Sequence, residues 1–242
     1  MTPIPMPEVE LRIHKAIVEH AAREQKRDYL GISEIGEPCE RRLWAKVNDL
    51  PRSASSEFSP RLRMIFSLGD CIEEEVIRLL AMAGYEVHYT DPDTGEQFEA
   101  TDFDGRLKGH LDGKIWINRE VRDPSVLEIK SANEKSFEEF IELGYERWNP
   151  KYWGQIHGLM GWFGIDTALA VVYSKNTSRI HSEFIRFDHS YFELLVGRAI
   201  RVLSCDAPEI PAEATSASCT FCKWCPYNEW CWGPLPKVNF AA

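Results

Sequence analysis

The segment VLEIKSA, residues 126–132, constrains the fold of this chain more than any other stretch. Its β-branched and large apolar residues are typical of a buried strand. Side chains alternate between the two faces of a strand, so Glu128 and Lys130 share one face while Leu127 and Ile129 fill the other. We therefore expect a buried strand that presents a carboxylate and an ammonium group side by side.

The patterns around this strand predict a fold of class α/β. Helical spacing covers residues 10–28, 38–47, 64–83, 134–146, 150–163 and 188–204, and strand-like patterns cover 85–90, 97–101, 105–117, 125–131, 167–175 and 182–187. This order predicts a central mixed sheet flanked by helices. We expect one domain over residues 1–206 and a small cysteine-rich segment, 207–242, that packs on the amino-terminal region.

Length and charge narrow the class of protein. The 242 residues contain no apolar run of about 18 residues, so no membrane span is expected. No secretory signal is apparent, and we expect a cytoplasmic protein. The net charge of −10 weighs weakly against a nucleic-acid partner, because a local basic track and bound cations can still hold phosphates. Candidates for such a track are Arg41, Arg42, Lys135 and Lys151.

A second acidic residue, Asp112, precedes Glu128 by sixteen positions. Asp112 lies in GHLDG, a strand-like setting in which His110 would share its face. If the two strands are neighbours, Asp112, Glu128 and Lys130 meet at one end of the sheet. Two carboxylates this close repel each other, and a hard divalent cation such as Mg²⁺ or Mn²⁺ removes the repulsion. Lys130 would then hold an attacking water and stabilise developing negative charge.

Two helices offer further candidate site residues. Glu73 has mostly apolar helical neighbours, and a buried carboxylate needs a partner that a metal ion can provide. Tyr152 and Gln155 are three residues apart and share one face of their helix, where both can hydrogen-bond a phosphate or a base. Each feature also fits an ordinary helix edge.

Four of the seven cysteines lie within thirteen residues: Cys219, Cys222, Cys225 and Cys231. In a reducing cytosol this clustering indicates metal or iron–sulfur ligation. The four could form a local ferredoxin-like set or a zinc site, or one ligand could come from elsewhere in the chain. Cys71 and Cys205 lie in predicted helices and are expected to be small buried apolar residues.

Together these motifs resemble the PD-(D/E)XK nuclease superfamily, in particular its RecB-like exonuclease branch. The resemblance covers about residues 30 to 232 and rests on Gly69-x3-Glu73, Asp112, Glu128-Ile129-Lys130 and Tyr152-x2-Gln155. Cys39 before this core and Cys222-x2-Cys225-x5-Cys231 after it look like the iron–sulfur staple of the CRISPR-associated RecB-like exonucleases and the AddB nuclease domain.

The resemblance implies roles for these residues. Metal ligands would be Glu73, Asp112, Glu128 and the backbone carbonyl of Ile129, and the catalytic residues would be Asp112, Glu128, Lys130, Gln155 and Tyr152. A [4Fe–4S] cluster would be bound by Cys39, Cys222, Cys225 and Cys231, with Cys219 a bystander. The chain departs from the pattern at Leu111, where many relatives have Pro, and at Leu159, where the branch has Tyr.

The function implied is that of an Mg²⁺- or Mn²⁺-dependent deoxyribonuclease, acting as an exonuclease on single-stranded DNA or DNA ends. Recombination, repair or CRISPR adaptation would be its setting, with a recombinase, a helicase or an adaptation protein as partner. A phage origin would place it in the host cytoplasm. The alternatives are a catalytically inactive nuclease fold that binds DNA or protein, with an iron–sulfur or zinc site, and a zinc protein of unrelated function.

Overall fold

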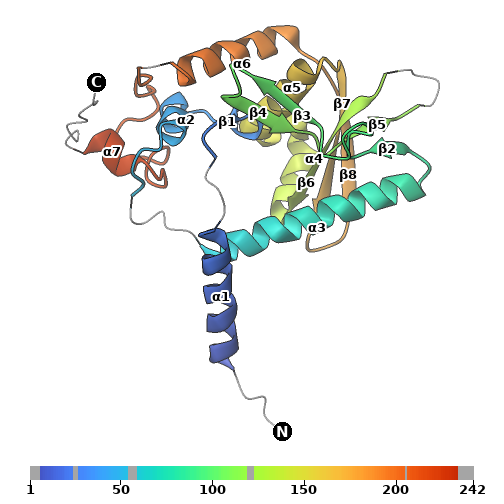
Figure 1. Ribbon diagram of the computed structural model, residues 1–242, viewed down its shortest axis with the longest axis horizontal. Helices are drawn as coiled ribbons and strands as arrows, with labels where there is room; N and C mark the ends of the chain where they lie inside the picture. The colour runs from blue at the N-terminus through green and yellow to red at the C-terminus, as the bar shows by residue number, and fades with distance from the viewer. Residues whose placement is uncertain (1–5, 24–26, 54–58, 119–122, 205, 234–242) are drawn as a thin grey trace.

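The structure is a computed structural model that describes residues 6–23, 27–53, 59–118, 123–204 and 206–233 (Figure 1). Its elements, in chain order, are α1 (Pro7–Ala21), β1 (Leu30–Gly31), the 3₁₀ helix η1 (Ile32–Glu34), α2 (Glu40–Val47), α3 (Pro60–Met82), β2 (Glu86–His88), β3 (Glu99–Asp102), β4 (Leu107–His110), β5 (Gly113–Trp116), β6 (Ser125–Ala132), α4 (Glu134–Trp148), α5 (Pro150–Phe163), β7 (Thr167–Ser174), β8 (Ile180–Arg186), α6 (His189–Val202) and α7 (Asn228–Trp232).

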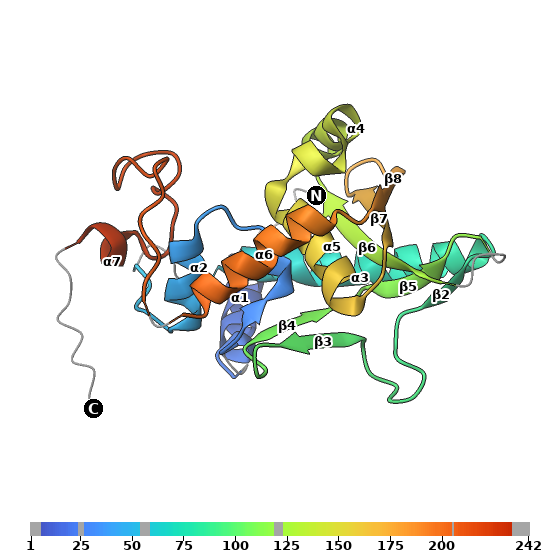
Figure 2. The ribbon, with the colours of Figure 1, turned by 90° about the horizontal axis from the view of Figure 1, so that it is seen from above.

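The predicted α/β fold with a mixed sheet and flanking helices is confirmed. The larger sheet has the strand order β2-β5-β6-β7-β8, in which only β6 and β7 run parallel. A parallel pair needs a long crossover, and α4 and α5 provide it. A smaller sheet of order β1-β4-β3 lies apart from the first, and α5 contacts strands of both sheets (Figure 2).

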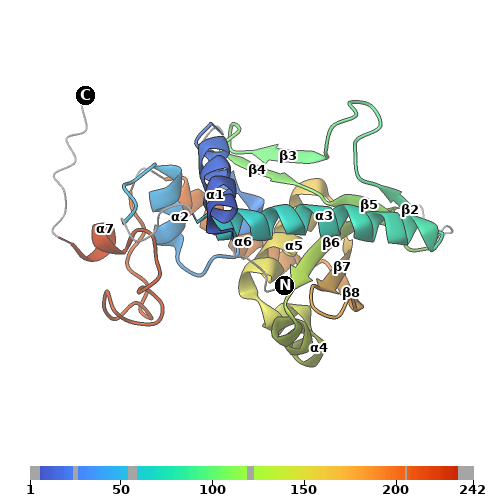
Figure 3. The same ribbon diagram turned by 90° about the horizontal axis from the view of Figure 1, so that it is seen from below.

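The two faces of β6 bury different sets of side chains. Leu127 and Ile129 pack with Ile72 and Val76 of α3, which lies across this strand (Figure 3). Val126 belongs to the core formed with α4, α5 and α6, so Glu128 and Lys130, which alternate with Leu127 and Ile129, lie on the α4–α5 side. The alternation predicted for this strand is therefore confirmed.

Side-chain caps determine where two of the helices begin. The side chain of Asn149 accepts a hydrogen bond from the Lys151 amide (3.0 Å), and Pro150 occupies the first turn of α5. Asp188 caps α6 in the same way by accepting from the Tyr191 amide (3.0 Å). At α2 the expectation is wrong by two residues, because Cys39 is the N-cap and Pro38 precedes it.

Three other expectations are wrong. Residues 105–117 form two short strands in different sheets, because the chain leaves one sheet at Leu111–Asp112 and enters the other. The apolar side of α3 is buried only around Ile72 and Val76, so Cys71 is exposed. The helix expected over residues 10–28 is α1, which begins at Pro7 and ends at Ala21; it projects away from the sheets in Figure 1 and has no buried residue. Cys205 lies outside the described residues.

Within the described residues every helix is too short or too polar to cross a lipid bilayer.

Candidate active site and cysteine cavity

The pairing of β5 with β6 brings the two predicted acids together. Gly113 is the partner of Leu127 in this antiparallel pair, so Asp112, just before β5, stands opposite Glu128. The Asp112 Oδ2 atom accepts a hydrogen bond from the Ile129 amide at 2.7 Å. This bond fixes Asp112 at the end of the sheet although the residue itself lies outside a strand.

Glu128 is the most enclosed charged residue of the site, with an exposed fraction of 0%. Its Oε1 atom forms an ion pair with the Lys130 ammonium, and its Oε2 atom has no hydrogen-bond partner among the described residues. Burial raises the pKa of the Glu128 carboxyl to about 8, the Lys130 charge counteracts this, and Asp112 and Glu73 add to it. A buried oxygen without a partner is costly and indicates a missing ligand.

Lys130 lies beside Glu128 and Asp112. Burial alone would lower the pKa of its ammonium, but the charges of Glu128 and Asp112 outweigh burial and raise it. The Nζ atom also donates to the Ile129 carbonyl (3.3 Å) and lies 5.4 Å from the centre of the Tyr152 ring. Lys130 is therefore a charged amine held at the centre of the site.

Glu73 reaches the same region from α3. A Cβ atom at Gly69 would lie 3.9 Å from the Ser131 hydroxyl, so this part of α3 passes next to the end of β6. Burial raises the pKa of the half-buried Glu73 carboxyl to about 7, and the Asp112 charge is the next cause. Glu73, Asp112 and Glu128 thus form one electrostatically coupled group, which we call the carboxylate site.

The side chains of the carboxylate site are not arranged as a complete set of metal ligands. Within the described ranges, no group of three or more His, Cys, Asp or Glu side chains is already arranged to hold a metal ion. The ammonium of Lys130 is the positive charge that Glu128 contacts in this arrangement. The metal ligands and catalytic roles assigned from the sequence therefore stay predictions, although Glu73, Asp112 and Glu128 lie near enough to one another for their charges to interact.

The remaining sequence candidates divide into two groups. Tyr152 is near Lys130, and Gln155 is buried about one turn further along α5. His110 does not join the carboxylate site, because β4 belongs to the smaller sheet and the His110 Nε2 atom lies 3.0 Å from Glu99 Oε2.

Sequence reasoning missed one residue beside the carboxylates. Tyr145 of α4 is fully buried, and its hydroxyl has no hydrogen-bond partner within the described residues. Burial raises the pKa of this phenol well above its usual value, and the charges of Glu128 and Asp112 raise it further. The available signal was Gly144, a residue type that interrupts a predicted helix immediately before Tyr145.

The cysteines gather at the other end of the molecule. Four cysteines from distant parts of the chain line one cavity of about 180 Å³. They are Cys39, Cys222, Cys225 and Cys231, and Cys219 is not among the lining residues. Burial raises the pKa of the Cys39 thiol to about 11, and Cys225 and Cys231 contribute to the rise. The four residues line one cavity, but within the described part of the chain they are not arranged to hold a metal ion, so the cluster assigned from the sequence stays a prediction.

Arg41, expected on a basic track, holds the cysteine-rich segment. Its Nε atom donates to the Cys231 sulfur (3.1 Å) and its Nη1 atom to the Pro208 carbonyl (2.8 Å). Its guanidinium also lies 4.4 Å from the centre of the Trp230 ring. Two of the other candidates form ion pairs with nearby acids: Arg42 with Glu37, and Lys135 with Glu139.

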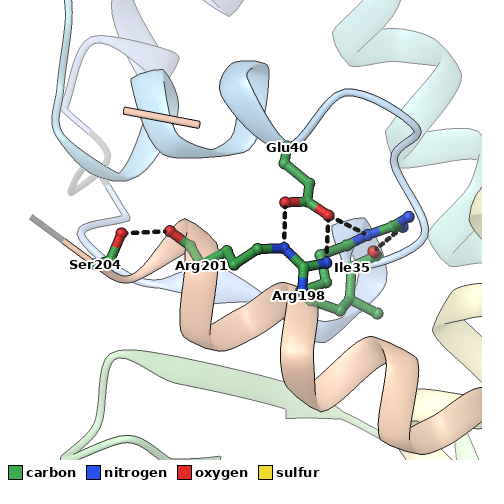
Figure 4. Close-up of polar contacts among 5 residues, drawn as sticks. All are labelled: Ile35, Glu40, Arg198, Arg201 and Ser204. Atoms are coloured by element: carbon green, nitrogen blue, oxygen red, sulfur yellow. Dashed lines mark hydrogen bonds and ion pairs between the residues drawn. The ribbon is translucent and has the colours of Figure 1, made fainter. Parts of the chain in front are cut away.

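The helix that follows Cys39 is fixed to α6 by ion pairs. Glu40 accepts two hydrogen bonds from Arg201 (2.7 and 2.8 Å) and lies 3.5 Å from the Arg198 Nε atom (Figure 4). Arg198 also donates to the Ile35 carbonyl (2.8 Å). These contacts fix the position of Cys39 at the start of α2.

Comparisons with known proteins give a match in structure alone. No family model and no curated protein matches the sequence. An alkaline exonuclease from Laribacter hongkongensis is similar in fold, with a TM-score of 0.51 and 14% identity over 74% of this chain and 87% of that one. The chain therefore shares the α/β fold of an exonuclease.

Two further structures match with lower scores. The same exonuclease in complex with dAMP has a TM-score of 0.46 and 15% identity, over 71% of this chain and 88% of that one. A protein named SSO0001 has a TM-score of 0.46 and 16% identity, over 92% of this chain and 95% of that one.

Proposed function

We propose that the protein is a divalent-metal-dependent DNA exonuclease of the PD-(D/E)XK, RecB-like type. The observation that carries the proposal is the meeting of Glu73, Asp112 and Glu128 with Lys130 on a fold shared with an alkaline exonuclease. Three acids and an amine have no structural need to converge at the end of a buried strand, because burying charge costs free energy.

The carboxylate site fits a hard divalent cation. Its donors are oxygen atoms, which Mg²⁺ and Mn²⁺ prefer. Among the residues that the structure describes, Glu128 Oε2 has no hydrogen-bond partner, and the mutual repulsion of the acids helps to raise the pKa of Glu73 and Glu128. A bound cation would supply Lewis-acid activation of a phosphodiester. Glu73, Asp112, Glu128 and the Ile129 carbonyl would hold it.

The other residues act on the substrate. The Lys130 ammonium, held between Glu128 and the Ile129 carbonyl, would donate a hydrogen bond to the oxygen of the scissile phosphate where negative charge develops. Tyr152 covers Lys130 from α5, and Gln155, buried about one turn further on, would support the bound strand from the same helix. In-line attack by a water oxygen would form a new bond to phosphorus and break the opposite P–O bond. The leaving oxygen would take up a proton and become a hydroxyl, while the other fragment would keep the phosphate, and the proton lost by the water would pass to solvent.

We also propose a structural [4Fe–4S] cluster in the cysteine cavity. The shared cavity favours Cys39, Cys222, Cys225 and Cys231 as its ligands over a local set that includes Cys219. The cluster would fasten the carboxyl-terminal segment to the start of α2, where Arg41 and Trp230 already join the two.

The substrate would be single-stranded DNA or DNA ends, in recombination, repair or CRISPR adaptation. The sequence lacks a phosphate-binding GxxxxGK[ST] motif, so a partner such as a helicase or a recombinase would supply any unwinding.

The test is degradation of end-labelled single-stranded DNA with Mn²⁺. Wild type should release short products, and Lys130→Ala should be slower by about 100-fold or more. Lys15→Ala, which changes an exposed lysine of α1, is the matched control and should act like wild type. A circular substrate separates exonuclease from endonuclease activity. Equal degradation by Lys130→Ala and wild type would refute the proposed chemistry.

A further inference from the structure

Tyr145 carries a buried hydroxyl that has no role in the hydrogen bonding of the described residues. Its ring is enclosed by Phe140, Trp148 and Tyr152, with ring centres 5.2–6.5 Å apart within this aromatic group. The hydroxyl has no hydrogen-bond partner within the described residues. Phenylalanine would fill the same space without this cost, so packing alone does not explain a tyrosine here.

A specific backbone feature holds Tyr145 in place. Gly144 interrupts α4 with φ 73° and ψ 163°, a conformation that favours glycine. The Tyr145 amide, released from the helix by this kink, donates to the Glu183 Oε2 atom of β8 at 3.0 Å. The kink and the Glu183 contact together fix where the Tyr145 side chain begins.

The strand register shows where Tyr145 stands relative to the carboxylate site. Glu128, Ala170 and Glu183 are partners in one row across β6, β7 and β8, so all three lie on the same face. Ala170 leaves room between the two acids, and it belongs to the same buried core as Tyr145. With its amide bound to Glu183, the backbone of Tyr145 stands next to the row to which Glu128 belongs.

In the part of the chain that the structure describes, the Tyr145 hydroxyl and Glu128 Oε2 are both buried polar atoms without a hydrogen-bond partner, and Tyr145 and Glu128 both belong to this side of the sheet. The two groups are close enough for the carboxylate charge to act on the phenol. A hydroxyl is a donor and a carboxylate oxygen an acceptor, so each supplies what the other lacks, in direct contact or through one buried water.

We propose that Tyr145 is a positioning residue: its hydroxyl donates a hydrogen bond to Glu128, directly or through a water, and fixes the orientation in which that carboxylate binds a divalent cation. This inference rests on the proposed function. It adds a residue from α4 to a site otherwise built from α3, β6 and the residue before β5.

The experiment compares Tyr145→Phe with wild type in Mn²⁺ titration calorimetry, steady-state kinetics and thermal unfolding. Loss of a group that orients a metal ligand typically weakens binding about 10-fold or more. We expect this loss for Mn²⁺, a lower kcat with little change in KM for DNA, and an unchanged melting temperature. Tyr191→Phe, a half-buried tyrosine of α6, should match wild type in all three.

A double variant tests whether Tyr145 affects Mn²⁺ binding through Glu128. In a Glu128→Asp background the shorter carboxylate is withdrawn from Tyr145, so Tyr145→Phe should cause no further loss of Mn²⁺ binding. Wild-type Mn²⁺ affinity in Tyr145→Phe, a fully additive loss in the double variant, or a melting temperature that falls with activity would each overturn the inference. Absence of nuclease activity in wild type would instead refute the proposed function.

Discussion

At the scale of single residues, the central observation is a carboxylate that the fold encloses completely. Glu128 is 0% exposed and forms an ion pair with Lys130. Removing a carboxylate from water costs free energy that a single ion pair often fails to repay. Its position next to Asp112 adds repulsion, so the site is destabilising in the absence of a cation and is explained best by the ligand that it would bind.

This cost predicts a pH dependence of stability. The folded protein keeps a proton on Glu128 up to about pH 8, whereas the carboxyl in the unfolded chain loses it near 4.5. Between these values the folded state binds more protons, so stability falls as pH rises. Glu73 contributes in the same direction up to about pH 7. Thermal unfolding in EDTA should therefore give a higher midpoint at about pH 5.5 than at about pH 9.

Two controls accompany this measurement. Glu128→Gln cannot ionise at this position and should flatten the dependence. Mn²⁺ binds the deprotonated carboxylates and should raise the midpoint most at high pH. A cation-free midpoint that rises from acid to alkaline pH would contradict the buried, proton-binding state of Glu128.

Residue patterns revealed part of this site. The alternation in VLEIKSA placed Glu128 and Lys130 on one face, and the structure agrees. The same reasoning placed His110 with Asp112 and was wrong, since a two-residue period holds only within one strand. Tyr145 escaped notice because its location depends on the Gly144 kink and on Glu183, which lies 39 positions after Gly144 in the sequence.

At the scale of elements, one backbone contact links the two sites. Gly36, three residues before Cys39, packs against the first turns of α5, where a Cβ atom on Gly36 would lie 2.6 Å from the carbonyls of Pro150 and Lys151. A Cβ atom on Gly154 would collide with the Gly36 backbone in turn. This contact fixes the segment that leads to Cys39 against the helix that carries Tyr152.

Gly154→Ala should therefore push these two elements apart and lower the free energy of unfolding by about 1–3 kcal/mol. Urea unfolding measures the change. Gly197→Ala is the matched control, because a methyl group there would meet only the flexible side chain of Arg201. In the middle of α6 that substitution should be neutral or stabilising by up to about 1 kcal/mol. Equal stability of the two variants would show that the Gly36–Gly154 contact is not close-packed.

The hydrophobic periodicity of the sequence predicted a helix or strand correctly where the whole element packs against the same surroundings. The α5 prediction matched because Asn149 and Pro150 set its start locally. The prediction for α3 identified the helix but not its exposure, since Ile65 and Leu68 lie 39% and 49% exposed. Periodicity shows that a helix has an apolar side and leaves open how much of that side the fold covers.

At the scale of the whole molecule, the cysteine cavity joins chain segments almost 200 positions apart. Cys39→Ser should lose most of the iron of anaerobically purified protein, whereas Cys219→Ser should keep it, because Cys39 lines the cavity and Cys219 does not. Iron content per chain and the brown absorbance of the cluster measure the outcome. Full iron in Cys39→Ser would reassign the fourth ligand to Cys219.

In the function that we propose, acids from α3, from β6 and from the residue before β5 bind one divalent ion together. Equilibrium dialysis with Mn²⁺ tests it most directly, with Asp112→Asn compared to Glu99→Gln, which changes an acid of the smaller sheet. We predict one tightly bound Mn²⁺ per chain in wild type and Glu99→Gln, and its loss in Asp112→Asn. Undiminished binding in Asp112→Asn would contradict the claim.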